Sequence, residues 1–291
     1  MSIAGGLENA ILDAARHRCR ALQIFSKSSN QWAAKHLTEE DVATWRDTLS
    51  AHPMRVVVHD SYLINLASPD PALLARSREA FLEEVRRCDR LGIRYLIFHP
   101  GAHMQSGEET GLARIAESLD WVCTRAEDSP AMLLLETTAG QGTTLGHRFE
   151  HLAWIIDRTK ARRRLGVCID TCHVLAAGYD MRTEEGYEKV FAEFNRLIGL
   201  DRLHCFHVND SKKDLDSRVD RHEHIGKGHV GASAFGFLMR DPRFTDVPKI
   251  LETPKEDEMD RTNLALLRRL ASGERSKPAR TPRRQTPSEA I

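Results

Sequence analysis

Short apolar runs recur along this chain at the spacing of strands in a parallel sheet, and they limit its fold more than any other feature. Each run is too short for a helix and apolar at successive positions, as in a strand buried on both faces. The runs cover residues 21–25, 56–58, 95–98, 132–135, 167–169, 205–208 and 249–251.

Helical patterns separate these runs. Asp70-Pro71 is a typical helix start, since Asp caps the first turn and Pro fits the first helical position. Apolar residues then recur on one face, and similar patterns cover residues 112–122 and 149–156. Alternating strands and helices predict an α/β fold with a parallel sheet. Seven such units in 291 residues favour a single-domain (β/α)8 TIM barrel, one strand short.

We expect the barrel to cover residues 1–272 and residues 273–291 to form a disordered basic tail. This end of the chain holds five basic and two acidic residues and shows no apolar periodicity. The whole chain has 42 basic and 42 acidic residues, so the body without the tail carries a formal charge of −3. A neutral chain argues at first against a nucleic-acid partner.

The composition also bears on where the protein acts. The six cysteines are spread along the chain without a Cys-x-x-Cys pair, which is typical of reduced thiols in a cytoplasmic protein. No apolar run reaches the length of a membrane span, and the first residues do not resemble a signal peptide. We therefore expect a cytoplasmic protein without membrane contact.

Ionisable side chains end or follow six of the seven predicted strands, at the face of a TIM barrel where chemistry takes place. One such residue could simply cap a loop, but six that converge on one barrel mouth favour a functional site. Acids gathered there would repel one another unless cations neutralised them. The six are His59, His99, Glu136, Asp170, His207 and Glu252.

Three further residues extend this set. His173 lies three positions after Asp170, and Asp220 and His222 lie two apart in a loop. Imidazole and carboxylate ligands suit zinc, and also manganese or iron. Nine ligands are too many for one ion. Three divalent ions would bring the body from −3 to +3, with the positive charge where a phosphate would bind.

The chain resembles the endonuclease IV family of apurinic/apyrimidinic (AP) endonucleases from Ser2 to about Leu270. The motifs that carry this resemblance occur in the family's order. They are HDSYLINL (59–66), FHPG (98–101), ETTAGQG (136–142), CIDTCH (168–173), AAGYD (176–180), HVNDSK (207–212), SRVDRH (217–222), GKG (226–228) and LET (251–253).

The resemblance implies a barrel with three Zn²⁺ ions. His59 and His99 would bind the first, Asp170, His207 and Glu252 the second, and Glu136 would bridge these two. His173, Asp220 and His222 would bind the third. The expected catalytic residues are Glu136 and Glu252, and we expect Glu252 also to orient the attacking hydroxide.

The resemblance also implies a reaction and a substrate. The family hydrolyses the phosphodiester 5′ to an abasic site in double-stranded DNA, which leaves a 3′-hydroxyl and a 5′-deoxyribose phosphate, and it clears blocked 3′ ends. Such an enzyme would associate with the nucleoid while it acts, and the family suggests a monomer.

Six residues correspond to DNA-contacting positions of the family: Lys27, Gln31, Tyr62, Leu63, Arg221 and Lys227. For Leu63 a purely structural role is equally open, and Lys227 could be an ordinary surface charge. Asn30 stands where well-known members carry an intercalating arginine. This departure argues against strong wedge insertion and does not affect the chemistry.

A second departure from the family pattern concerns the first residues of the sequence. The family begins with a strand that reads roughly I-G-A-H-V-S, whereas this sequence starts at Met1-Ser2. We therefore expect the first barrel strand to be missing, through a start assigned at an internal codon. A barrel open at this point would expose two strand edges. Two other functions remain open: a two-metal sugar isomerase or epimerase of the same barrel type, and a catalytically silent binder of damaged DNA.

Overall fold

Seven parallel strands form the centre of the fold. The computed structural model describes residues 1–273 apart from 34 and 256–257, so the predicted tail lies outside the described residues except for Gly273. The strands are hydrogen-bonded in the order β1-β2-β3-β4-β5-β6-β9. They are β1 (Ala21–Phe25), β2 (Arg55–His59), β3 (Tyr95–Phe98), β4 (Met132–Glu136), β5 (Leu165–Asp170), β6 (Leu203–His207) and β9 (Lys249–Ile250). The predicted TIM-barrel order and all seven predicted strands are confirmed.

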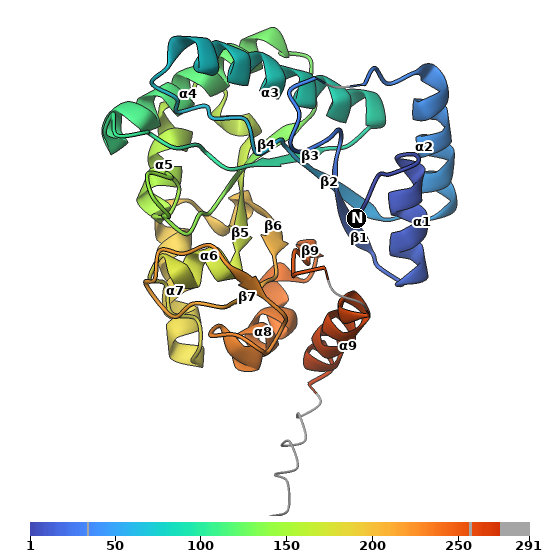
Figure 1. The fold of residues 1–291 in the computed structure, drawn as a ribbon. Helices are drawn as coiled ribbons and strands as arrows, with labels where there is room; N and C mark the ends of the chain where they lie inside the picture. The colour runs from blue at the N-terminus through green and yellow to red at the C-terminus, as the bar shows by residue number, and fades with distance from the viewer. Residues whose placement is uncertain (34, 256–257, 274–291) are drawn as a thin grey trace, which may run out of the picture.

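Helices follow the strands and surround the sheet (Figure 1). Asp70 caps α3 as predicted: its carboxylate accepts a hydrogen bond from the Leu73 amide at 2.9 Å, and Pro71 is the first helical residue. The helices are α1 (Glu8–Arg16), α2 (Glu39–Ala51), α3 (Pro71–Leu91), α4 (Glu108–Arg125), α5 (Phe149–Arg158), α6 (Thr171–Ala176), α7 (Glu184–Leu197), α8 (Gly231–Arg240) and α9 (Met259–Ala271). No helix within the described residues is both long and apolar enough to cross a membrane.

Each strand packs on two sides, and this explains its uninterrupted apolar sequence. Outward-facing residues such as Phe98 and Phe206 are fully buried in the large core that the helices share with the sheet. Inward-facing residues form a second, smaller apolar layer inside the barrel. The members of this interior layer are Val57, Ile97, Leu134, Cys168, Cys205 and Ile250.

The sheet ends at β1 and β9, and no strand pair joins these two within residues 1–273 as described. A cavity of about 520 Å³ lies between them, lined by Ala21, Gln23, Lys249 and Leu251 among others. The amino group of Met1 donates to the Gln23 carbonyl at 2.8 Å. The described barrel therefore has seven strands and two unpaired strand edges, in agreement with the count from the sequence.

Candidate metal centre

All nine predicted metal ligands lie at the carboxyl end of the barrel. The period-2 geometry of the strands explains six of them, because each lies two residues after a member of the interior layer and so faces the same axis. Glu136, for example, follows Leu134 and ends β4, while His207 follows Cys205 and ends β6.

Glu136 is at the middle of the group and is almost fully buried. Its Oε2 lies 3.1 Å from His59 Nε2 and 3.4 Å from His99 Nε2. Its Oε1 lies 2.9 Å from His207 Nδ1 and 3.3 Å from His173 Nδ1. One carboxylate thus contacts four imidazoles from four segments, as a ligand shared between cations would.

His207 also contacts the second carboxylate of the centre. Its Nδ1 lies 3.0 Å from Glu252 Oε2 and 4.0 Å from Asp170 Oδ2. The Glu252 side chain is 20% exposed, whereas those of Glu136 and Asp170 are buried. Glu252 is therefore the carboxylate of this group that a substrate or water can reach.

The third group depends on two local structures. Asp170 ends β5 and caps α6, where its Oδ1 accepts from the His173 amide at 2.9 Å, so the i,i+3 spacing brings His173 over the barrel. The short antiparallel pair β7 (Asp210–Ser211) and β8 (His222–Glu223) returns the intervening loop to the mouth. Asp220 then lies 3.2 Å from His173 Nε2 and 3.4 Å from His222 Nε2.

Backbone carbonyls orient three of the histidines for metal binding. The Nδ1 atoms of His59, His173 and His222 lie 2.8–3.0 Å from the carbonyl oxygens of Asp60, Thr137 and Glu252. Since a carbonyl can only accept, each Nδ1 carries a proton. Nε2 is then the ring nitrogen of each that is left to bind a metal ion, and this is the arrangement that metal-binding histidines show.

Two of these nitrogens also lack a hydrogen bond. His173 Nε2 and His222 Nε2 are buried, and neither has a hydrogen-bond partner among the described residues, although Asp220 lies beside both. Buried polar atoms rarely lack a hydrogen-bond partner. The donor set of imidazole nitrogens and carboxylate oxygens therefore fits divalent metal ions.

The electrostatics favour a bound positive charge. Burial raises the pKa of Glu136, but the His207 and His99 imidazoles lower it further, to well below its usual range. Burial likewise raises the pKa of Asp220, and contact with His173 and His222 lowers it to about 2. For His207, burial lowers the pKa, but Glu136 and Glu252 raise it well above its usual value. The carboxylates thus stay ionised and attract cations into the site.

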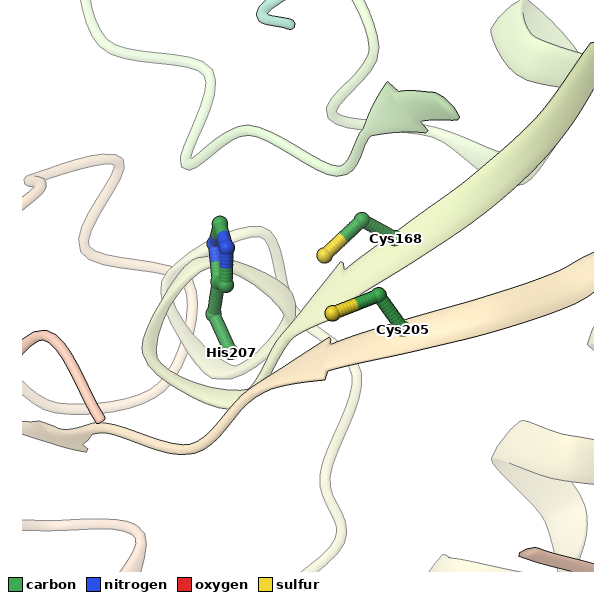
Figure 2. A group of neighbouring side chains, drawn as sticks. All are labelled: Cys168, Cys205 and His207. Atoms are coloured by element: carbon green, nitrogen blue, oxygen red, sulfur yellow. The ribbon is translucent and has the colours of Figure 1, made fainter. Parts of the chain in front are cut away.

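Two thiols lie directly beneath His207. Cys168 on β5 and Cys205 on β6 are register partners and fully buried, and Figure 2 shows both sulfur atoms on the same side of the imidazole. Their sulfur atoms and a ring nitrogen of His207 lie within 4.8 Å of one another. All six cysteines are free. The spacing in the sequence gave no indication of this pair.

The predicted DNA-contacting residues lie around the mouth in different environments. Tyr62 is 57% exposed, and its ring lies 5.6 and 6.3 Å from the rings of His59 and His99. Leu63 is half-buried beside it and Gln31 is exposed. Lys27 is buried: its Nζ donates to the Gln31 carbonyl at 3.0 Å and lies 3.5 Å from Glu84.

Arg221 and Lys227 are both exposed, next to the loop that carries Asp220. The Arg221 guanidinium donates to the Asp220 carbonyl at 2.7 Å. Both cations are therefore available to an approaching phosphate, and their DNA contacts stay a prediction.

Two residues that support the ligands were not predicted. Asn209 donates to Asp170 Oδ2 at 2.6 Å and accepts from the Glu252 amide at 2.8 Å, so it links two strand ends. Gln23 contacts both His207 and Glu252. The sequence holds a signal for Gln23, because it is the one polar residue in the run ALQIF.

Comparison with known proteins identifies the class to which this fold and site belong. Residues 11–270 match the family model described as xylose isomerase-like TIM barrel. Within this class the chain belongs to the endonuclease IV family. It is 55% identical over 273 residues to a probable endonuclease 4 of Geobacter sulfurreducens, which covers 93% of this chain and 92% of the relative. It is 51% identical to a probable endonuclease 4 of Chloroflexus aurantiacus, with coverages of 94% and 97%.

Solved structures agree with this assignment. The crystal structure of endonuclease IV from Thermus thermophilus has a TM-score of 0.84 and 35% sequence identity, and the match covers 94% of this chain and 97% of that one. A D-tagatose 3-epimerase-like protein matches with a TM-score of 0.72 but only 19% identity. The likeness to this epimerase-like protein therefore shows the fold alone.

Proposed function

We propose that this protein is a metal-dependent AP endonuclease that hydrolyses the phosphodiester 5′ to an abasic site in double-stranded DNA. The observation that carries the proposal is the convergence of nine imidazole and carboxylate side chains at one barrel mouth, in a chain 55% identical to a probable endonuclease 4. We further propose that the ions are three Zn²⁺ and that the enzyme also removes blocking groups from 3′ ends.

The residues divide into three proposed groups. His59 and His99 would hold a first ion, Asp170, His207 and Glu252 a second, and Glu136 would bridge the two. His173, Asp220 and His222 would hold a third. When bound, such ions neutralise phosphate charge and lower the pKa of a water molecule.

The chain's own residues bind and orient the substrate. Glu252 is more accessible than Glu136 and Asp170, the other two carboxylates beside His207. Its Oε2 would therefore accept a hydrogen bond from the attacking water and direct it towards phosphorus. Tyr62 presents an exposed ring above His59 and His99, where it can stack on a base next to the missing one. Arg221 and Lys227 would contact backbone phosphates.

Incision of a defined duplex tests the proposal. Zinc-loaded protein is incubated with an oligonucleotide duplex that contains one tetrahydrofuran abasic analogue, and with the same duplex without it. We expect a single cut 5′ to the analogue, with a 3′-hydroxyl that a polymerase can extend. Binding without cutting would indicate a silent binder of damaged DNA, and no effect on either duplex would overturn the nuclease assignment.

A further inference from the structure

Gln23 joins two of the proposed ligands from inside the barrel. It lies on β1, is only 6% exposed, and is paired in register with Val57 of the interior layer. Its amide nitrogen donates to Glu252 Oε1 at 2.6 Å. Its amide oxygen lies 2.7 Å from Nε2 of His207. One neutral side chain thus contacts a carboxylate and an imidazole that are far apart in sequence.

These contacts require a proton on Nε2 of His207. A carboxylate can only accept, so the amide group of Gln23 must turn its NH₂ to Glu252 and its oxygen to His207. An amide oxygen can also only accept, so His207 Nε2 must carry a hydrogen. The other ring nitrogen, Nδ1, then faces Glu136 Oε1 at 2.9 Å and Glu252 Oε2 at 3.0 Å.

We propose that Gln23 is a positioning residue of the metal centre. It selects Nδ1 as the nitrogen through which His207 binds the second ion. It also holds Oε1 of Glu252, so that Oε2 points to the proposed site of the same ion. This inference rests on the proposed function. It assigns a role to β1, which alone among the seven described barrel strands provides none of the nine ligands at its end.

The neighbouring side chains support this role over simple space filling. The interior layer below the centre is apolar at the equivalent positions of the other strands, apart from the two thiols. An unpaired amide there would cost about 1–3 kcal/mol. Both polar ends of Gln23 are instead directed at ligands. Outer partners of this kind typically contribute about 10–100-fold to metal affinity.

The test compares Gln23→Met with Val57→Ala. Methionine fills a similar volume without either hydrogen bond, while Val57→Ala perturbs the same layer at the register partner of Gln23 and removes no polar group. Zinc affinity is measured by competition with a chelating indicator, and the protonation of His207 by long-range ¹H–¹⁵N NMR of zinc-loaded protein. We expect Gln23→Met to lower the affinity of one zinc about 10–100-fold, and Val57→Ala to lower stability but not affinity.

The native protein provides a second test that needs no variant to fold. Its NMR spectrum must show His207 bound through Nδ1 with a proton on Nε2. Binding through Nε2, or unchanged zinc affinity in Gln23→Met, would overturn the inference. A native protein that binds no zinc or does not incise the abasic duplex would instead overturn the proposed function.

Discussion

Replacing Glu136 with glutamine should strongly destabilise the metal-free protein. The carboxylate is 1% exposed and lies 2.9–3.4 Å from four imidazoles, and glutamine keeps its shape but removes its charge. The folded-state pKa of Glu136 is below its ordinary value, so its contribution to stability is fully present at pH 7 and is lost only as the pH falls through that lowered pKa. Removal of one partner from a buried ion pair costs about 3–5 kcal/mol.

Urea unfolding at pH 7, followed by circular dichroism, measures this loss. Glu108→Gln is the matched control, because Glu108 also faces two histidines and an arginine but its side chain is 44% exposed. An exposed contact of this kind contributes about 0–1 kcal/mol. We also expect Glu136→Gln to slow abasic-site incision by roughly 10²–10³-fold or more. Equal losses of stability in the two variants would refute the reasoning.

Three further predictions concern other residues. Tyr62→Ala should weaken binding to abasic DNA by about 1–3 kcal/mol in a titration, without a change in the unfolding midpoint, because the ring is largely exposed. Arg221→Ala should reduce the slope of log binding constant against log salt by about 0.9, and an unchanged slope would exclude a phosphate contact. Burial and the adjacent His147 and Arg148 lower the pKa of His151 to about 4, so stability should fall as the pH drops from about 6.5 towards 4. Between pH 7 and 4.5 the free energy of unfolding should therefore fall by about 2 kcal/mol less in His151→Gln than in the native protein, as denaturation curves at the two pH values would show.

The strands and most of the centre could be predicted because both depend on local patterns. A buried parallel strand is a short apolar run, and the residue that ends it lies at the mouth of the barrel. Glu136 and His207 therefore follow from the ends of LLLE and CFH without knowledge of any contact. The cap of α3 at Asp70 is local in the same way.

Contacts between distant segments could not be predicted from such patterns. Gln23 and Glu252 are 229 residues apart and meet only because β1 and β9 are the two ends of one curved sheet. Lys27 was predicted to contact DNA, but its side chain packs against Glu84 of α3, which no spacing in the sequence indicates. Its contact with DNA stays a prediction, and in the structure its ammonium group donates to the Gln31 carbonyl and so holds that loop.

The interior layer explains why the ligands form a strong electrostatic site and not merely a polar surface. Each strand-end ligand lies two residues after an apolar or thiol side chain that faces the barrel axis, so the same alternation that directs the ligands inward also packs an apolar layer beneath them. Apolar neighbours of this kind lower the local dielectric, and charge interactions strengthen as it falls. On β1 the corresponding side chain is Gln23, which contacts His207 and Glu252 directly. The amide of Gln23 therefore lies at the level of the apolar layer, from where it can orient His207 and Glu252 above it.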